Sequence, residues 1–275
     1  MKPLFLLTLL FLATPTRAQD FCPFPPDFSG TFDFVKDLKK NVEPDLIEVS
    51  KIDYQRNSKA SFCTRPLEMV DTVVIHHSET PSTSTPTYIN MLHLNRGTPN
   101  DPWYMIAYGY VINSPYAGGS IPKPLVTEGR PMEIVGAHAG SNAFVPMDDE
   151  QKKLWDEGKI RCGKEGEEPK VDPALVKDGK IKANVTTIGV VINGNYSPYD
   201  KRNNPGGYPK NKPRYPTKAT QDMIARLACQ VQKKHPKVKN IKWHNYYQST
   251  SCPGTIKNYI GQIKALAKEY GCEFQ

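Results

Sequence analysis

The sequence predicts an α/β fold in which helices cover the faces of a β-sheet. Segments rich in β-branched apolar residues alternate with segments whose apolar residues recur at helical spacing, and this alternation is typical of such folds. The strand-like runs are almost continuously apolar, as in strands buried on both faces. The chain has 275 residues, enough for one large domain with additional segments, and no internal repeat is visible.

The expected core elements follow one another between residues 68 and 275. DTVVIHH is an apolar run typical of a buried strand. TKATQDMIARLACQVQKKH predicts a helix, because its apolar residues recur every three or four positions. In chain order we expect a strand at 71–77, a helix around 85–95, a strand at 105–113, a strand at 187–194, a helix at 217–235, a short strand at 241–244 and a helix at 255–271.

Three segments lie outside this pattern. Residues 19–67 carry Pro, Asp, Lys and Phe with little periodicity, and we expect them to form an N-terminal extension packed on the core. Residues 143–183 are highly charged, with runs such as DDEQKKLWDEGK, and we expect a solvated surface insertion there. A loop rich in Pro, Gly and Lys is expected at 197–216.

The first 18 residues have the pattern of a signal peptide. Lys2 precedes the apolar run PLFLLTLLFLATP, and Thr16-Arg17-Ala18 places small residues where a signal peptidase reads them. A membrane anchor is the alternative, but the run is shorter than the roughly 20 residues that span a bilayer. We therefore expect residues 1–18 to be removed, leaving an exported protein, periplasmic or extracellular, with no membrane span.

The charge of the chain is modestly basic. The formal net charge is +8, and it falls by two to +6 without Lys2 and Arg17. A basic exported protein suits an anionic surface such as a cell wall, although this balance is more often only a solubility feature. The Lys and Arg residues are scattered and not interleaved with aromatic residues along one element, so nucleic acid is disfavoured as a partner.

Six cysteines in an exported chain first suggest three disulfides. Cys229 and Cys272 can pair if their two helices pack side by side. Cys22 and Cys63 both precede the first clear strand and could also pair. The sequence does not decide the connectivity.

On that pairing, Cys162 and Cys252 remain. Cys162 would be a free or intermolecular thiol, and Cys252 could be a metal ligand. His76 and His244 each end an expected strand, and Cys252 precedes Pro253-Gly254 and an expected helix whose N-terminus favours a thiolate. Two imidazoles and one thiolate are donors that a catalytic zinc ion takes, with a fourth position left for water. Taken singly, each residue is more often a core histidine or a disulfide cysteine.

Six segments, taken in order, resemble the type-2 family of zinc-dependent N-acetylmuramoyl-L-alanine amidases, which includes phage amidase-type lysozymes and animal peptidoglycan recognition proteins. The resemblance covers roughly residues 70–270, apart from the insertion. The segments are VVIHHSET at 73–80, WYMIAYGYVI at 103–112, EGRPMEIVGAHAGSN at 128–142, TIGVVING at 187–194, PTKATQDMIARL at 216–227 and WHNYYQSTSCPG at 243–254.

The resemblance implies a single domain with a central mixed β-sheet flanked by helices, and a Zn²⁺ cofactor. It assigns the zinc ligands to His76, His244 and Cys252. Tyr108 takes the place of the family's active-site tyrosine. Thr250 takes a place that is lysine in the phage enzymes and threonine in many recognition proteins.

Four further residues are implied as substrate contacts: His93, Trp103, Arg130 and His138. His77 is expected to be structural, because neighbouring residues on a strand point to opposite faces. Tyr110 is expected on the same face as Tyr108. The insertion leaves the core beside His138, and we expect it to border the substrate groove.

The implied function is a hydrolase that cuts the amide bond between N-acetylmuramic acid and L-alanine in peptidoglycan or muropeptides, acting as a monomer. The alternative is a recognition protein that binds muropeptides without cleaving them. Cys252 favours the enzyme, since family members without the cysteine are thought only to bind. A third alternative is an exported disulfide protein without zinc. One branch of the family has a glutamate where this chain has Val191, so the proton-transfer group is left open between Tyr108 and a relayed water.

Overall fold

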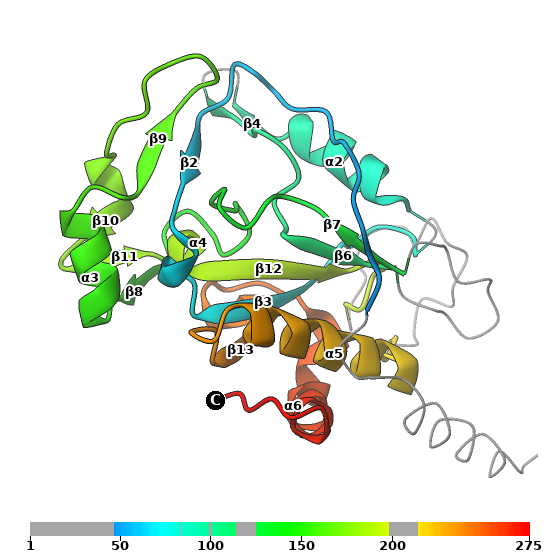
Figure 1. The fold of residues 1–275 in the computed structure, drawn as a ribbon. Coiled ribbons are helices and arrows are strands. Elements are labelled where there is room, and N and C mark those ends of the chain that lie inside the picture. Colours follow the sequence, from blue (N-terminus) through cyan, green and yellow to red (C-terminus); the bar gives the residue numbers. More distant parts are fainter. Residues whose placement is uncertain (1–46, 83, 99–100, 114–124, 198–213) are drawn as a thin grey trace, which may run out of the picture. The chain divides into compact units, whose positions relative to one another are not determined.

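A central sheet of six strands forms the middle of the computed structural model (Figure 1). The structure describes residues 47–275 except 83, 99–100, 114–124 and 198–213. The expected signal peptide, Cys22 and most of the expected loop at 197–216 lie outside the described residues. All described residues belong to one compact unit, Glu43–Gln275.

The sheet is mixed, as predicted, because it contains both parallel and antiparallel strand pairs. Only β6 and β7 pair antiparallel, and the other neighbours pair parallel. The first strand of the sheet comes from the segment expected to be an N-terminal extension. In spatial order the strands are β1 (Val49–Ser50), β7 (Val126–Glu128), β6 (Tyr110–Ile112), β12 (Thr187–Ile192), β3 (Thr72–His77) and β13 (Asn240–Trp243).

The strands β3 and β12 lie at the centre because they are apolar on both faces. All six residues of each strand are buried, and they pair in parallel from Thr72 and Thr187 onward. Alternate residues then face opposite sides of the sheet. Val73 and Ile75 face one side, and His76 faces the other with its register partner Val191.

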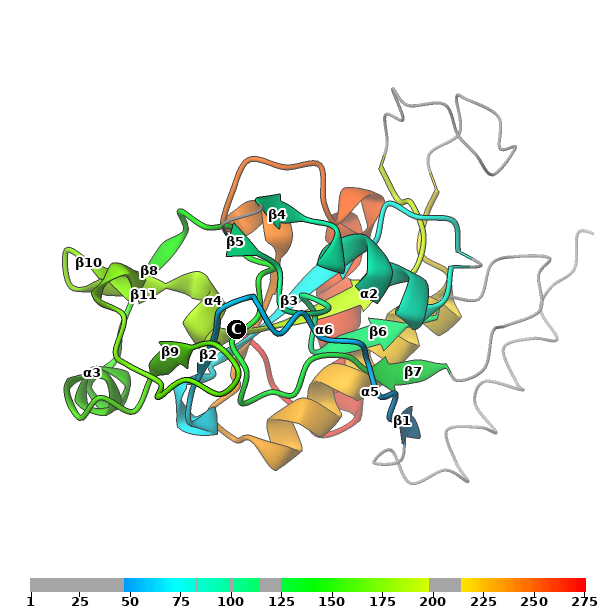
Figure 2. The ribbon, with the colours of Figure 1, turned by 90° about the horizontal axis from the view of Figure 1, so that it is seen from above.

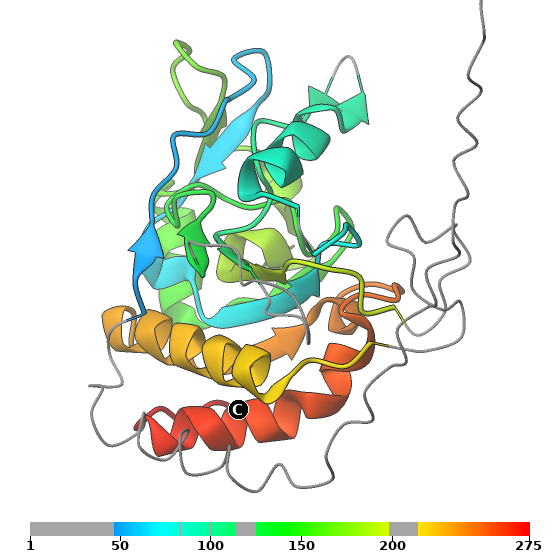
Figure 3. The same cartoon turned by 90° about the vertical axis from the view of Figure 1, so that its right-hand side faces the viewer.

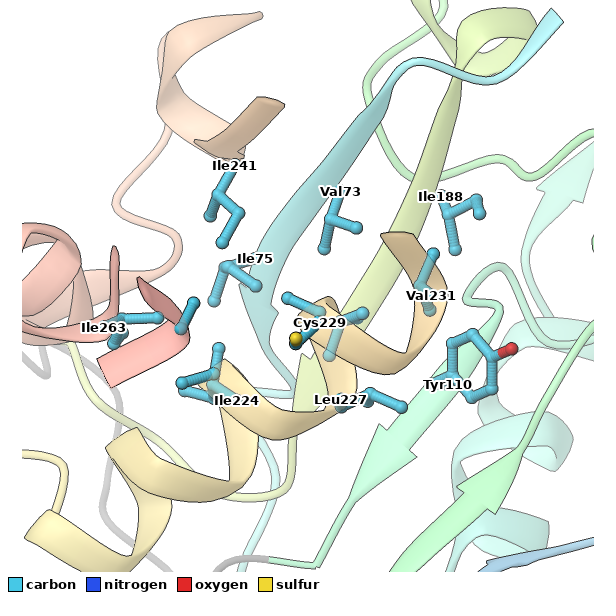
Figure 4. Packing of buried hydrophobic residues seen from close by; sticks show 14 of the residues in the cluster. Val73, Ile75, Tyr110, Ile188, Ile224, Leu227, Cys229, Val231, Ile241 and Ile263 are labelled. Atoms are coloured by element: carbon cyan, nitrogen blue, oxygen red, sulfur yellow. The ribbon is translucent and has the colours of Figure 1, made fainter. Parts of the chain in front are cut away.

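Two helices cover the first face. They are α5 (Lys218–Lys234), capped by the Thr217 side chain, and α6 (Ile260–Glu269), and they lie side by side beneath the sheet in Figure 3. Ile224, Leu227 and Val231 of α5 pack against Val73, Ile75 and Ile188 of the sheet (Figure 4). This cluster is the main hydrophobic core.

The opposite face is covered by α2 (Pro86–Leu94), which starts at the capping side chain of Thr85 and lies across the sheet from α5 (Figures 1 and 2). Ile89 of α2 packs with Ile106, Val111 and Val191 in a second, smaller core cluster. A two-stranded sheet follows α2, formed by β4 (Gly97–Thr98) and β5 (Asp101–Pro102).

The insertion at 143–183 holds more regular structure than its charged composition indicates. Ile160, Leu175 and Ile181 are buried in a third apolar cluster with Met69 and Val135 of the core. Its elements are β8 (Phe144–Pro146), α3 (Asp149–Asp156), β9 (Arg161–Gly163), η2 (Pro173–Leu175), β10 (Val176–Lys177), β11 (Lys180–Lys182) and α4 (Ala183–Thr186). Short 3₁₀ helices elsewhere are η1 (Leu67–Met69), η3 (His244–Tyr246) and η4 (Gly254–Tyr259).

Two disulfides are present among the described residues. Cys229 pairs with Cys272, as predicted. The expected Cys22–Cys63 pair is wrong, because Cys63 bonds to Cys162, which is therefore not a free thiol. The cause is the antiparallel pairing of β2 (Phe62–Thr64) with β9, which puts Cys63 directly opposite Cys162.

The strand expected at 105–113 is regular only from Tyr110 to Ile112. Upstream, long-range side chains take the place of a strand partner. Asn90 Oδ1 accepts from the Ile106 N–H at 2.7 Å, and His93 Nδ1 accepts from the Ala107 N–H at 3.0 Å. Alternation is lost over this stretch, so Tyr108 and Tyr110 pack in different clusters and the expectation that they share a face is wrong.

Candidate metal centre

His76 is placed by the central strand β3. Its neighbour His77 points to the opposite face, where its Nδ1 accepts from the Tyr196 N–H at 2.8 Å, consistent with the structural role expected for it. The His76 ring is fully buried. Its Nδ1 lies 3.7 Å from Cys252 Sγ, and its Nε2 lies 3.1 Å from His138 Nδ1.

His244 reaches the same place from the edge strand β13. The strand β13 runs parallel to β3, with Trp243 opposite Ile75. His244 and His76 are the next residues along the two strands, so they lie side by side. Their ring centroids lie 4.5 Å apart. Both ring nitrogens of His244 are buried, and neither has a hydrogen-bond partner within the described part of the chain.

Cys252 returns to this point through the loop that follows η3. The loop is closed by the Asn245 N–H, which donates to the Cys252 carbonyl at 3.1 Å. The His77 backbone N–H donates to Cys252 Sγ at 3.3 Å. Among the described cysteines, Cys252 is the one outside a disulfide, and it is buried.

These three residues fit a metal ion. One ligand atom from each of His76, His244 and Cys252 lies within 4.8 Å of the other two. Two nitrogens and one sulfur form a donor set that suits zinc. Both His244 ring nitrogens lack a hydrogen-bond partner among the described residues, and this also supports a metal site, because buried polar atoms normally have partners.

Burial sets the protonation of these groups in the metal-free protein. It lowers the pKa of His76 well below the usual range and that of His244 to about 4, so both imidazoles are neutral near pH 7 and keep a lone pair for a metal. Burial raises the pKa of the Cys252 thiol to about 12, although the His77 N–H opposes the rise. The α-helix expected directly after Cys252 begins only at Ile260, behind the 3₁₀ helix η4, so the expectation that a helix N-terminus favours the thiolate is wrong. Because the thiol is protonated in the metal-free protein, metal binding would have to displace its proton.

Tyr108 and Thr250 border the cluster. The Tyr108 ring centroid lies 5.0 Å from that of His76. Burial, with a further contribution from Cys252, raises the pKa of Tyr108, so its phenol stays protonated. Thr250 Oγ1 accepts from the Cys252 N–H at 3.3 Å. Val191, beside His76 in the sheet, is fully buried and brings no carboxylate to this point.

Of the expected substrate contacts, His93 lies next to Tyr108, and Trp103 lies next to His93. The His93 ring centroid is 5.3 Å from Tyr108 and 5.2 Å from Trp103. The guanidinium of the exposed Arg96 lies over the ring of the partly buried Trp103, 5.7 Å from the ring centroid. Sequence reasoning missed Arg96, although its position three residues after His93 was a usable signal.

The other two, Arg130 and His138, are buried. Arg130 donates to the carbonyls of Ile106, Met105 and Val135, so a substrate contact would require these bonds to break. We do not include Arg130 among the residues proposed to touch substrate. His138 Nδ1 lies beside His76 Nε2, and the His138 side chain is only 4% exposed, whereas a residue that lines a groove would be open to solvent. Burial lowers the pKa of His138 to about 3.

Sequence reasoning also missed Glu79. Its carboxylate lies 3.6 Å from His77 Nε2 and accepts from Ser251 Oγ at 3.4 Å. It therefore links the end of β3 to the residue before Cys252. Its position three residues after His76, in a segment that must turn away from the sheet, was the available signal.

The root of the insertion packs against the loop between His244 and Cys252. Ala143 and Ala183, at its two ends, share a small apolar cluster with Tyr247. A Cβ at Gly140 would lie 2.1 Å from the Gln248 side chain. The insertion is therefore anchored beside the ligand loop.

Similar solved structures come from two groups of proteins. The amidase LysCS of Clostridium intestinale URNW is 17% identical, covers 83% of this chain and 98% of its own, and has a TM-score of 0.46. Bumblebee PGRP-SA is 13% identical, with 78% and 95% coverage and a TM-score of 0.46. Drosophila PGRP-LB is 18% identical, with 76% and 88% coverage and a TM-score of 0.41.

No protein-family model matches the sequence, and no curated protein sequence matches it either. Within the described residues, no helix is both long enough and apolar enough to cross a membrane.

Proposed function

We propose that this protein is an exported zinc-dependent amide hydrolase that cuts the bond between N-acetylmuramic acid and L-alanine in peptidoglycan or muropeptides. One observation carries the proposal: ligand atoms of His76, His244 and Cys252 meet within 4.8 Å, and both His244 nitrogens lack a partner in the described chain. The six sequence segments that resemble the type-2 amidases supply the reaction and the substrate class.

The three ligands hold the ion in this proposal. Zinc bound here would lower the pKa of a water molecule to about 7 and polarise the substrate carbonyl. The protein's own part is to keep both imidazoles neutral, to hold the thiolate with the His77 N–H, and to fix the three ligands on β3, at the start of η3 directly after β13, and on one closed loop.

Tyr108 and Thr250 act on the substrate carbonyl oxygen. The Tyr108 phenol remains protonated because burial raises its pKa, so it is a hydrogen-bond donor at the pH of the reaction. A donor aimed at an oxygen that gains negative charge in the transition state is worth about 3 kcal/mol. Since Val191 leaves no carboxylate beside His76, we assign to the Tyr108 hydroxyl the transfer of a proton from the attacking water to the leaving amine, in which the phenol takes up one proton as it gives up another and stays neutral.

Trp103 and Arg96 offer a partly exposed surface next to His93, which in turn contacts Tyr108. A guanidinium stacked on an aromatic ring suits an anionic ligand with apolar parts, such as a peptide stem with carboxylates, because the guanidinium can pair with a carboxylate while the ring contacts apolar atoms. We propose that the stem peptide contacts this pair. We further propose that the insertion, anchored beside the ligand loop, limits access to the centre.

The test is digestion of purified muropeptides, with products identified by mass. Wild-type protein should release free stem peptide when supplied with zinc and none when a chelator is present. Cys252→Ser should be inactive, because it replaces the thiolate ligand. Ser249→Ala, an exposed change in the same loop, should retain activity.

The alternative function has its own outcome. Protein that binds one zinc ion and binds muropeptide, but releases no peptide, would be a recognition protein. Protein that takes up no zinc, even after refolding with it, would contradict both functions and favour a disulfide-stabilised protein without metal.

A further inference from the structure

We propose that His138 is a positioning residue, which holds His76 in the tautomer whose Nδ1 is free to bind a metal. This inference rests on the proposed function. Its basis is a buried chain of hydrogen bonds that runs from His76 through His138 to Thr187 and ends on the Ala183 carbonyl.

The proton positions along these hydrogen bonds follow from the Thr187 end. The Thr187 hydroxyl donates its one hydrogen to the Ala183 carbonyl at 2.7 Å. Towards His138 Nε2 it can then offer only its oxygen, at 3.3 Å, and the Thr187 carbonyl lies 3.4 Å from the same nitrogen. Two acceptors around His138 Nε2 require that this nitrogen carries the hydrogen.

The rest of the chain follows from the chemistry of neutral imidazole. His138 has one ring hydrogen, so its Nδ1 holds a lone pair and accepts from His76 Nε2 at 3.1 Å. His76 therefore carries its hydrogen on Nε2. Its Nδ1, which lies 3.7 Å from Cys252 Sγ, keeps the lone pair that a metal requires.

The surroundings hold the His138 ring in this position. A Cβ at Gly189 would lie 2.7 Å from the ring, and a Cβ at Gly136 would lie 2.6 Å from it, so both glycines leave room for the imidazole. Asn184 Oδ1 accepts from the backbone N–H groups of His138 and Ala139, at 2.9 and 2.7 Å. The guanidinium of Arg65 donates to the Thr187 carbonyl at 2.9 Å and helps to fix that acceptor.

The first experiment reads the tautomer without any metal. Long-range proton–nitrogen correlation spectra of metal-free wild-type protein should show His76 protonated on Nε2 and His138 protonated on Nε2. In His138→Leu, which removes the acceptor, His76 should become a mixture of tautomers. A wild-type His76 protonated on Nδ1, or a His138→Leu spectrum with His76 unchanged, would overturn the inference.

The second experiment measures zinc affinity against a chromophoric chelator. His138→Leu should weaken zinc binding by about 10- to 100-fold, the usual effect of removing a ligand's hydrogen-bond partner. His138→Asn, whose side-chain oxygen can accept from His76, should recover most of the affinity. Ile224→Ala, a core change on the opposite face, controls for general destabilisation and should leave zinc affinity unchanged.

The two proposals fail in different ways. Equal zinc affinity in wild type and His138→Leu, with wild type binding zinc tightly, contradicts the role of His138 alone. Failure of the wild type to bind zinc contradicts the proposed function, while the tautomer spectra still decide the hydrogen-bond chain.

Discussion

At the scale of single residues, one side chain of the candidate centre, His244, has no hydrogen-bond partner among the described residues, and another, Cys252, is a buried thiol. His244 buries two ring nitrogens without a hydrogen bond to any described residue, and Cys252 buries a thiol whose pKa is raised to about 12. A buried polar group without a partner costs about 1–3 kcal/mol of stability. We therefore expect metal binding and folding stability to be coupled in this protein.

The first prediction concerns His244→Ala. Zinc should stabilise the wild type, by about 2.7 kcal/mol when free zinc exceeds the dissociation constant 100-fold. The variant should lose nearly all of this gain. Without metal, its free energy of unfolding should differ from that of wild type by less than about 1 kcal/mol, because no hydrogen bond to described residues is lost. Urea unfolding with and without zinc measures both quantities.

The control for this prediction is His235→Ala, at the end of α5. It should keep the full zinc-dependent gain. A gain in His244→Ala equal to that of wild type would show that His244 is not a ligand.

The second prediction concerns His93 and pH. Burial, followed by Arg96 and Arg130, lowers the pKa of His93 to about 3, whereas an unfolded histidine titrates near 6.5. The unfolded chain therefore binds this proton more tightly. The stability present above pH 6.5 is lost as pH falls towards 3, by up to about 1.4 kcal/mol per pH unit for this one group.

The His93→Asn variant tests this assignment, since the asparagine Oδ1 can take the place of His93 Nδ1 and accept from the Ala107 N–H. Metal-free unfolding free energies between pH 6 and pH 5 should depend less steeply on pH in the variant, by about 1.4 kcal/mol per pH unit at most. The same slope in both proteins would mean that His93 titrates normally.

At the scale of elements, the sequence predicts those segments whose burial follows a regular pattern. The strands β3 and β12 are buried on both faces and read as apolar runs, and α5 shows its helical spacing and its Thr217 cap. The segment at 105–109 has the same apolar composition but is no regular strand. Its backbone bonds to Asn90, His93 and Arg130, and a pattern of apolar residues carries no information about such distant partners.

The third prediction concerns the glycine next to that segment. A Cβ at Gly129 would lie 2.3 Å from the Tyr108 carbonyl oxygen, a backbone atom that cannot move alone. Gly129→Ala should destabilise the protein by about 1–3 kcal/mol, as overpacking does, and should lower activity by shifting Tyr108. Thermal unfolding and muropeptide digestion measure the two effects.

The matched control is Gly261→Ala within α6, where an added Cβ meets nothing within 4 Å. It should stabilise the protein by about 0.5–1 kcal/mol, because alanine favours the helix. If Gly129→Ala were as stable as wild type, the close approach to Tyr108 would be wrong.

At the scale of the whole molecule, two disulfides join segments far apart in sequence. Cys63 and Cys162 are separated by 99 residues, and Cys229 and Cys272 by 43. The second pair could be predicted from two helices with facing apolar sides. The first could not, because it depends on a strand pair between β2 and the charged insertion, where no periodic pattern marks a partner.

The fourth prediction is that Cys229→Ala/Cys272→Ala lowers the free energy of unfolding by about 2–4 kcal/mol, since an unfolded chain without this crosslink gains conformational freedom. Zinc affinity should stay the same, because both cysteines lie on the sheet face opposite His76. Chemical unfolding and zinc titration of the double variant check these outcomes. An equal stability, or a loss of zinc binding, would contradict them.

The candidate site could be anticipated only in part. The resemblance names His76, His244 and Cys252, and the structure brings their ligand atoms together because β3 and β13 end at the same edge of the sheet. It also suggests a surface place for His138. The burial of that ring against His76 depends on the glycines that make room for it, which sequence alone does not reveal.

The central claim is that water is added across one amide bond of a muropeptide. The most direct measurement is digestion in water labelled with heavy oxygen, followed by mass analysis of both products. We expect one labelled oxygen in the new carboxyl group of the N-acetylmuramic acid product and none in the peptide with its free L-alanine amine. Label in the peptide, or an intact muropeptide after incubation with zinc-loaded protein, would contradict the account.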